Sequence, residues 1–469
     1  MELEATRNLK VIEAKIQELL LKLQDVNITT YSLPNMGESE NLEKSIRTIS
    51  SKLADWITAK KFQQLLMLKD LAGRIRSIAQ REGRYYVNKG LRAVRIRFAG
   101  GSTISLVAAY WVERRSKHSM GVFLSLYLLG IYEHCSPLLV AEIPKLCAAL
   151  GSFQEARALL ADRECHVDIK TIRCVMKRFA QRARSCQKAK SHLMFPSEQL
   201  DGCRAVVSSD GGRLRIRKNK RGKRTPKGRS RYHTDWREPK LLIIYVVDEQ
   251  GRMSSAFAPI IDGSLAGPES LYALIWLYLH ALGVSKVEQI LFVADGAPWI
   301  WECLQALKSL LRLRGIQCLV IELIDMYHAV QHLHAFVNMK RGWGQKKRSR
   351  WVHAQKKRLR EGKTESVLQA LQDGCRGAKS KTLAREREYF VKNRKRLDYA
   401  TVRAKNLPIG SGAIESAMRR VVNLRMKSPC IFWGEETASE MLLLRAYYKA
   451  GRWESLKIAA YEGGILCAA

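Results

Sequence analysis

Residues 289–301 read QILFVADGAPWIW, a short apolar run that ends in Asp295 and Gly296 and continues into a proline and two tryptophans. The run has the length and composition of a buried β-strand. A buried strand tolerates a carboxylate poorly, so an acid at its end requires an explanation. Asp-Gly is also a common turn sequence, and this stretch alone leaves both a turn and a functional acid open.

Apolar runs and helical patterns alternate on both sides of this stretch, between residues 204 and 323. The first three runs follow one another closely enough for an antiparallel meander, whereas the later runs are separated by helices and therefore pair in parallel. The expected fold class is α/β with a mixed five-stranded sheet. The sequence predicts strands at 205–210, 241–248, 254–262, 289–295 and 318–325, and helices near 268–283 and 299–314.

The chain of 469 residues is longer than a single hydrophobic core usually allows, so several domains are expected. A helical insertion is expected to interrupt the α/β core. The predicted segments are a helical N-terminal region (1–85), a β-hairpin region (86–118), a helical DNA-binding domain (119–195), the first part of the core (200–328), the insertion (329–405) and the C-terminal helices of the core (406–469).

The N-terminal segments carry three local patterns. Apolar residues at spacings of three and four predict a helical seam that packs inside this chain or against a second copy. Alternation of Val94, Ile96 and Phe98 with arginines, followed by a Gly-Gly pair, predicts a β-hairpin. Two helices joined by a short polar turn within 153–180 resemble a helix-turn-helix, with an ordinary helical hairpin as the alternative. The seam residues are Leu9, Ile12, Ile16, Leu19, Leu23 and Val26.

The composition is that of a basic globular protein. Lys and Arg number 81 against 44 Asp and Glu, the formal net charge is +37, and 46% of the residues are hydrophobic. Such a charge favours a polyanionic partner, and so much apolar material excludes a disordered basic tail. The 11 cysteines form no C-x-x-C pair, which predicts reduced thiols. With no expected signal peptide or membrane span, we expect a cytoplasmic protein without membrane contact.

Three predicted strands end in acid, at Asp210, Asp295 and Asp325. Functional groups gather at the C-terminal ends of parallel strands in α/β sheets. Neighbouring carboxylates repel one another, so they normally hold a cation or share a proton. Oxygen ligands suit two Mg²⁺ or Mn²⁺ ions acting on a phosphodiester. Glu415, in the first turn of a helix entered through Gly-Ser-Gly, is the further acid expected there, with a merely helix-stabilising acid as the alternative.

An Asp on the first strand, an Asp on the fourth and a Glu after a large helical insertion resemble the DDE transposases of the RNase H-like, retroviral-integrase-like superfamily. The motifs SSDGGR, TDWREPK, ADGAPWIW, DMYH and IGSGAIES look like those of the Kra-type transposases of bacterial insertion sequences. The resemblance extends roughly over residues 120–450. It implies an RNase H-like core.

The resemblance also implies the chemistry. Asp210, Asp295 and Glu415 would be the catalytic, metal-binding residues of a DNA transposase, which cleaves with water to expose a 3′ hydroxyl and then joins that hydroxyl to target DNA. Asp325 and His328 match the Asp-x-x-His element of mutator-like and related transposases, which implies supporting roles. The implied partner is double-stranded DNA, as terminal inverted repeats and as target. Paired-end chemistry implies a dimer or higher oligomer on DNA, at the nucleoid of a bacterial cell.

Basic residues that we expect to contact DNA lie in four parts of the chain. The acid-free run RLRIRKNKRGKRTPKGRSR (213–231) lies beside the expected acidic site, where a basic hairpin loop can follow phosphates. A solvated charge run is the alternative. Trp343, Trp351 and Trp433 fit either base stacking on unpaired DNA or core packing. The predicted contacts are Arg213, Arg215, Arg217, Lys218, Lys220, Arg221, Lys223, Arg224, Lys170, Arg173, Lys177, Lys346, Lys347, Arg348, Arg419 and Arg420.

Two other functions stay open at this point. A non-catalytic DNA-binding protein derived from a transposase would keep the charge and the fold, and the presence of all three acids disfavours it. An RNase H-like nuclease would cleave DNA without strand transfer. Joining of a pre-cut DNA end to a plasmid distinguishes a transposase from that nuclease.

Overall fold

The structure is a computed structural model that describes residues 2–26, 36–79, 86–114, 121–189, 191, 195, 200–226, 228, 230–376, 380–429 and 431–468. The chain forms two compact units, one of residues 1–189 with 454–469 and one of residues 190–453. The segment predicted as 406–469 is therefore divided between the two units. In the described part of the chain, no helix is long and apolar enough to cross a membrane.

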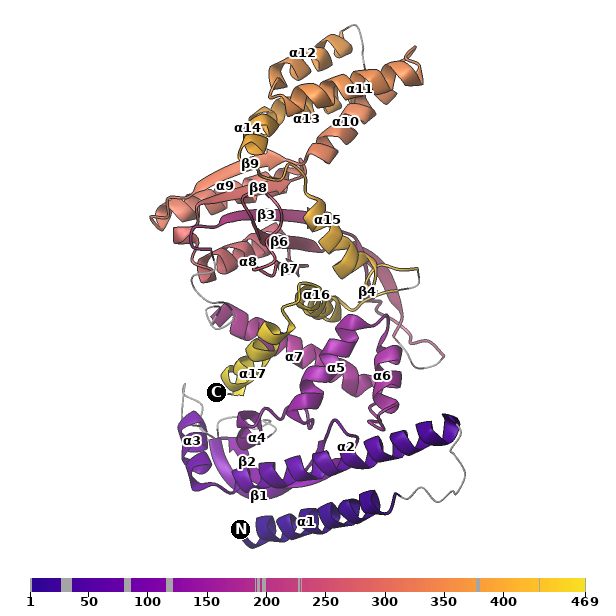
Figure 1. Ribbon diagram of the computed structural model, residues 1–469, viewed down its shortest axis with the longest axis vertical. Coiled ribbons are helices and arrows are strands. Elements are labelled where there is room, and N and C mark those ends of the chain that lie inside the picture. Colours follow the sequence, from indigo (N-terminus) through magenta and orange to yellow (C-terminus); the bar gives the residue numbers. More distant parts are fainter. Residues whose placement is uncertain are drawn as a thin grey trace. The chain divides into compact units, whose positions relative to one another are not determined.

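The first unit is mainly helical and contains the predicted β-hairpin (Figure 1). Its elements are α1 (Glu2–Gln24), α2 (Met36–Leu66), α3 (Lys69–Ala79), β1 (Tyr86–Arg97), β2 (Thr103–Glu113), α4 (Leu124–Leu128), α5 (Pro137–Ala149), α6 (Phe153–Ala161), α7 (Ile169–Ala189) and α17 (Trp453–Ala468).

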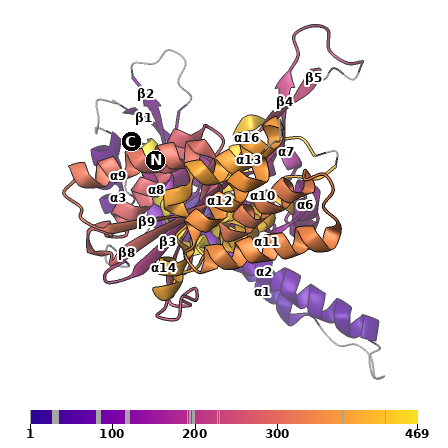
Figure 2. The ribbon, with the colours of Figure 1, turned by 90° about the horizontal axis from the view of Figure 1, so that it is seen from above.

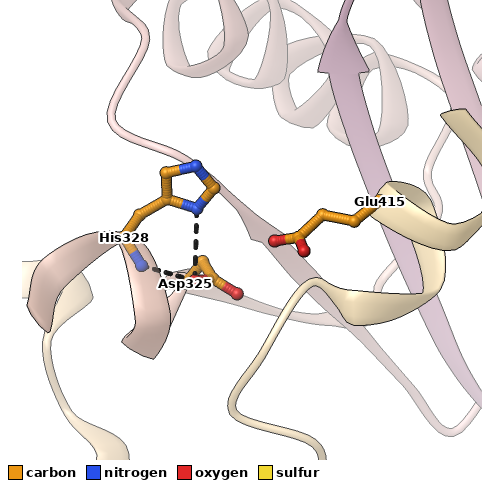
Figure 3. A group of neighbouring side chains, drawn as sticks. All are labelled: Asp325, His328 and Glu415. Atoms are coloured by element: carbon orange, nitrogen blue, oxygen red, sulfur yellow. Dashed lines mark hydrogen bonds and ion pairs between the residues drawn. The ribbon is translucent and has the colours of Figure 1, made fainter. Parts of the chain in front are cut away.

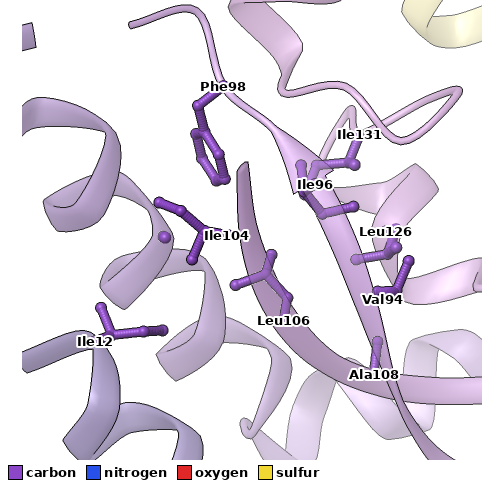
Figure 4. Packing of buried hydrophobic residues seen from close by; sticks show 10 residues of the cluster. Ile12, Val94, Ile96, Phe98, Ile104, Leu106, Ala108, Leu126 and Ile131 are labelled. Atoms are coloured by element: carbon purple, nitrogen blue, oxygen red, sulfur yellow. The ribbon is translucent and has the colours of Figure 1, made fainter. Parts of the chain in front are cut away.

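The core of the first unit lies between α1, α2 and the β1–β2 hairpin (Figure 4). Ile12 and Leu19 of the predicted seam are buried there, so in the described residues the seam packs inside this chain. Asp55 of α2 accepts hydrogen bonds from the backbone N–H groups of Gly100 and Ser102, each at 3.0 Å. The buried carboxylate thereby holds the hairpin turn, in which Gly101 has a φ of +91° that favours glycine.

The predicted pair of helices α6 and α7 is present, and α7 packs against α5 and α6. Asp168 accepts a hydrogen bond from the backbone N–H of Thr171 at 2.9 Å, which satisfies one of the free donors at the start of α7. Lys170 and Arg173 are exposed, and the guanidinium of Arg173 lies 5.3 Å from the ring centroid of Phe153. DNA binding by this helix pair stays a prediction.

The second unit contains a sheet, flanking helices and a group of helices inserted between β9 and α15 (Figure 1). Its elements are β3 (Arg204–Gly211), β4 (Leu214–Asn219), β5 (Tyr232–Arg237), β6 (Lys240–Val247), β7 (Ile260–Ser264), α8 (Pro268–Ala281), η3 (Val284–Lys286), β8 (Gln289–Ala294), α9 (Pro298–Leu313), β9 (Leu319–Ile324), α10 (Met326–Asn338), α11 (Gln345–Arg360), α12 (Thr364–Cys375), α13 (Lys381–Lys392), η4 (Arg394–Arg396), α14 (Tyr399–Ala404), α15 (Gly412–Met418), a π-helical turn η5 (Arg419–Asn423) and α16 (Glu435–Lys449).

The main sheet has five strands in the order β7-β6-β3-β8-β9. The β3–β6 and β6–β7 pairs are antiparallel, and the β3–β8 and β8–β9 pairs are parallel, so the predicted α/β class and mixed sheet are confirmed. Both β6 and β8 are buried along their whole length, as expected for strands covered on both faces. Helix α8 packs on β6 and β7, α15 on β3 and β6, and α16 on β7.

The basic run at 213–231, predicted as a hairpin loop, contains strand β4, which pairs with β5 (Tyr232–Arg237) in a two-stranded antiparallel hairpin. Figure 2 shows this hairpin projecting away from the rest of the second unit. Leu214 and Ile216 are fully buried and alternate with Arg215 and Arg217. Strand formation inside a charge run therefore follows from this period-two alternation, which the density of cations obscures.

The helical insertion carries a small core of its own. Phe336 of α10 is fully buried and stacks on Trp351 of α11, with ring centroids 5.6 Å apart. Trp433, 5% exposed, donates from Nε1 to the Met426 carbonyl at 3.0 Å. Core packing therefore accounts for Trp351 in the insertion and for Trp433, which lies outside it.

Trp343, the third tryptophan predicted either to stack on bases or to pack in a core, is half-buried, with the Lys347 ammonium 4.8 Å from its ring centroid.

Candidate functional site

The three strands predicted to end in acid are neighbours in the sheet. Val207 of β3 pairs with Phe292 of β8, and Ala294 of β8 pairs with Ile324 of β9. Continuing these parallel registers along each strand brings Asp210 level with Asp295, and Asp295 level with Asp325. Side chains at the same level of neighbouring strands point to the same face of a sheet. The continued registers thus place the three acids at the same edge of the sheet.

Glu415 reaches this place from α15, which packs over β3 and β6. Figure 3 shows its side chain extending from the helix toward Asp325 and His328. One potential ligand atom from each of these three residues lies within 4.8 Å of the other two. The hydroxyl of Ser411, at the start of α15, donates to Glu415 Oε1 at 3.4 Å.

Asp325 is fully buried and connects β9 to the loop that precedes α15. Its Oδ1 accepts from the backbone N–H of His328 at 2.7 Å, which caps α10. Its Oδ2 accepts from the backbone N–H of Ser411. The Met326 N–H adds a hydrogen bond to the Ile409 carbonyl at 3.0 Å. The Asp325 carboxylate therefore positions the loop that leads into the Glu415 helix.

The charges of Asp325 and His328 stabilise each other. Nδ1 of His328 lies 3.2 Å from Oδ1 of Asp325. This hydrogen bond raises the pKa of His328 above its usual range, although burial opposes the shift. Burial raises the pKa of Asp325, but hydrogen bonds from His328 and Ser411 outweigh burial and lower that pKa to about 2. Asp325 is accordingly an ionised carboxylate with donors on both oxygens.

The pKa of Asp210 is shifted in the opposite direction to that of Asp325. Burial raises the pKa of Asp210 to about 6, and the negative charges of Asp295 and Glu415 act in the same direction. The backbone N–H of Gly211, which donates to Oδ1 at 2.7 Å, and the charge of His328 lower it only in part. The negative charges of Asp295 and Glu415 thus act on Asp210, as expected for neighbouring acids without a compensating cation.

The carboxylates at this edge of the sheet fit a hard divalent cation, because carboxylate oxygens are the ligands that Mg²⁺ and Mn²⁺ prefer. Asp325, His328 and Glu415 form a group that can hold a metal ion. It shares only Glu415 with the predicted set of Asp210, Asp295 and Glu415, and among the described residues Asp210 and Asp295 are not members of this close group. A neutral imidazole can also be a ligand, so Asp325 and His328 have two possible roles, as ligands or as the predicted supporting groups. Two ions and their identity stay predictions.

Tyr389 of α13 lies against the acidic site and was not predicted from the sequence. A Cβ atom added to Gly296, the residue after Asp295, would overlap the Tyr389 ring. His332 stacks on this ring with centroids 3.6 Å apart, and its Nδ1 lies 2.5 Å from Oε2 of Glu386. Among the described residues, the Tyr389 hydroxyl has no hydrogen-bond partner. A tyrosine so distant in sequence leaves no local signal near Asp295.

The predicted DNA-contacting residues of the basic hairpin are half-buried or exposed. Arg215 and Lys218 are half-buried, and Lys218 forms an ion pair with Asp235 at 2.7 Å. The hairpin begins immediately after β3, because Gly212 N–H donates to the Pro239 carbonyl at 2.8 Å and closes its base. The exposed cations are Arg213, Arg217, Lys220, Arg221, Lys223 and Arg224.

The other predicted contacts are distributed over three elements. Lys170, Arg173 and Lys177 belong to α7 in the first unit, whereas Lys346, Lys347 and Arg348 form the first turn of α11 in the second. Arg419 is exposed in η5. Arg420 contacts the carbonyls of Ser416 and Lys449, each at 3.4 Å.

Comparison of the chain with protein-family models, with curated proteins and with solved structures finds no match to any of them.

Proposed function

We propose that this protein is a DDE-type DNA transposase that binds transposon ends, cleaves them in a metal-dependent reaction and transfers the cleaved strand to target DNA. The observation that supports the proposal most is the register that brings Asp210, Asp295 and Asp325 to one level on three neighbouring strands. Glu415 lies next to Asp325 and His328, on a helix that follows a large insertion. The strand order and directions agree with an RNase H-like core interrupted by helices.

The chemistry follows from the donor set. A divalent ion, when bound by these carboxylates, supplies the positive charge that activates an attacking oxygen and offsets charge on the leaving oxygen. Asp210, Asp295 and Glu415 would hold Mg²⁺ or Mn²⁺. Asp325 would fix the entry to the Glu415 helix, and His328 would hold the charge of Asp325 or a DNA phosphate in place.

The charge distribution supports DNA as the substrate. The chain has a formal net charge of +37, and the basic hairpin follows β3 directly after Asp210 and its neighbouring glycines. Cations next to an acidic site can hold a polyanion there, although carboxylates alone would repel it. Double-stranded DNA with terminal inverted repeats and a dimeric or higher assembly on it are parts of the same proposal.

The test uses the full chain with DNA that carries the terminal sequences flanking its reading frame. We expect Mg²⁺-dependent nicking of the end and joining of a pre-cut end to a plasmid. Asp295→Asn and Glu415→Gln should each abolish both reactions while retaining DNA binding. The matched control is Glu269→Gln, because Glu269 is an exposed acid in the first turn of α8 and should leave both reactions intact.

Each outcome separates the proposed function from its alternatives. Nicking without joining indicates an RNase H-like nuclease. Binding of the ends without nicking in Mg²⁺ or Mn²⁺ indicates a non-catalytic DNA-binding protein. Nicking that persists in the Asp295→Asn or Glu415→Gln variant contradicts the assignment of these acids.

A further inference from the structure

The β4–β5 hairpin has two chemically different faces. Side chains of a strand alternate between faces, so Leu214 and Ile216 lie on one face and Arg215 and Arg217 on the other. Leu214 and Ile216 are fully buried, which attaches their face to the second unit. The arginine face is directed away from this buried contact.

Two large aromatic side chains share the arginine face. Trp236 pairs across the hairpin with Arg215, and Tyr232 pairs with Asn219. Trp236 is 56% exposed and Tyr232 is 43% exposed. The guanidinium of Arg217 lies 4.7 Å from the Tyr232 ring centroid, and that of Arg215 lies 5.9 Å from the Trp236 centroid.

Phe432 completes the set from a distant segment. Its ring centroid lies 4.8 Å from the Arg215 guanidinium and 5.6 Å from that of Arg217. It also lies 6.0 Å from the Tyr232 ring centroid. We call Arg215, Arg217, Tyr232, Trp236 and Phe432 the aromatic face; its three rings are interspersed with two cations.

Backbone hydrogen bonds fix this face. The Arg217 N–H donates to the Trp433 carbonyl at 2.8 Å, and the Trp433 N–H donates to the Arg215 carbonyl at 3.1 Å. Nη2 of Arg215 also donates to the Ser428 carbonyl at 2.9 Å. The strand carrying the two arginines is thus bound to the segment that follows the Glu415 helix, so the aromatic face forms before any ligand arrives.

The chemistry of the face suits nucleobases better than duplex phosphates. Phosphates of a duplex require only cations, which the neighbouring basic tip already provides. Exposed rings add a surface on which unpaired bases stack, and guanidinium groups among them attract the phosphates between those bases. The hydrogen bond between Gly212 and Pro239 closes the base of the hairpin, so the hairpin begins directly after Asp210 and Gly211.

We propose that the aromatic face binds the unpaired nucleotides of a DNA strand next to the cleaved phosphodiester. The location of that phosphodiester rests on the proposed function, whereas binding of unpaired nucleotides does not. Trp236 and Tyr232 stack on bases, and Arg215 and Arg217 contact the intervening phosphates. A strand opened at a transposon end supplies such nucleotides.

Fluorescence anisotropy of the full chain in EDTA tests the proposal without requiring cleavage. The labelled probes are a blunt duplex, the same duplex with a single-stranded 3′ tail of about 8 nucleotides, and the tail strand alone. Trp236→Ala should weaken binding of the tailed and single-stranded probes about 5- to 100-fold, and binding of the blunt duplex less than about twofold. The salt dependence of binding should not change, because no cation is removed.

Two variants serve as controls. Trp236→Phe keeps a ring and should retain most of the binding to the tailed probe. Lys220→Gln removes an exposed cation of the tip, so it should weaken all three probes in similar proportion and lower the salt slope by about one. Circular dichroism checks the folding of each variant, and Tyr232→Ala provides the same test if Trp236→Ala does not fold.

Unchanged binding of the tailed probe, or an equal loss on all three probes, would overturn the proposal. A change from dimer to monomer in sedimentation without loss on the tailed probe would also overturn it, and would identify the face as a contact between copies. A protein that passes this test but does not cleave DNA in Mg²⁺ contradicts the proposed function alone.

Discussion

Gly296→Ala tests whether the glycine after Asp295 is required by packing or by a turn. The backbone at Gly296 does not have the positive φ that favours glycine. An added Cβ would instead overlap Cε2 of Tyr389, and it would lie 3.0 Å from Cζ and 3.1 Å from Cδ2 of the same ring. The substitution should therefore act through Tyr389 and not through the backbone conformation.

The expected cost follows from how little the Tyr389 ring can move. The ring stacks on His332 at 3.6 Å and packs edge-on against Phe390 at 5.3 Å, measured between centroids. Overpacking of this kind typically costs about 1–3 kcal/mol. For a unit of this size the cost corresponds to a fall in Tm of about 2–10 °C.

Thermal melts of the full chain measure this cost in a double-mutant cycle. Tyr389→Ala removes the ring, and in that background Gly296→Ala should cost less than about 0.5 kcal/mol. The control is Gly412→Ala, since a Cβ at Gly412 meets no atom within 4 Å, and its Tm should stay unchanged or rise slightly. Additive effects of Gly296→Ala and Tyr389→Ala would refute the steric explanation.

Two further variants test how the site is supported. Burial raises the pKa of Glu322, but hydrogen bonds from Lys308 and Arg396 outweigh it and lower that pKa, so Glu322→Gln should cost about 1–3 kcal/mol at pH 7. A carboxyl group with a lowered pKa in the folded state stabilises the fold at any pH above its unfolded pKa of about 4.3. This stability is lost as the pH falls through the folded pKa. The Tm difference between wild type and Glu322→Gln should therefore shrink in acid. Arg445 is 2% exposed and donates to the Val421 carbonyl at 2.7 Å. Arg445→Met should cost about 2–4 kcal/mol and weaken Mn²⁺ binding in a titration, whereas unchanged stability would contradict a supporting role.

Local patterns predict four strands of the sheet well because each of them has a pattern of its own, whereas the strand predicted at 254–262 is observed as β7 (Ile260–Ser264). The apolar runs that end at Asp210, Asp295 and Asp325 are strands β3, β8 and β9 and the residues that follow them, and the spacing between runs predicts their parallel pairing. Ile12 and Leu19 likewise lie in a core through their helical spacing. In these segments the side-chain period and the burial pattern agree.

Contacts between distant segments are what the sequence leaves undetermined. Nothing near Asp295 indicates that Tyr389 packs on Gly296, and nothing in the basic run indicates that Ile216 forms a bridge to Trp433. The sequence also does not show that Asp325 accepts a hydrogen bond from Ser411, because periodicity describes one element at a time. Acids at strand ends can therefore be proposed from the sequence, whereas the residues that pack against them cannot.

The hydrogen bond from Met326 to Ile409 has a topological consequence. The chain departs from the end of β9 and returns to the same point before α15, so the helices between these residues form a closed excursion. Because the two ends of this inserted segment already lie side by side, its length imposes no strain on the sheet. The parts of the excursion that do not contact the sheet can therefore differ in length without altering the strand order, whereas Tyr389 and Arg396 connect α13 and η4 to the sheet region.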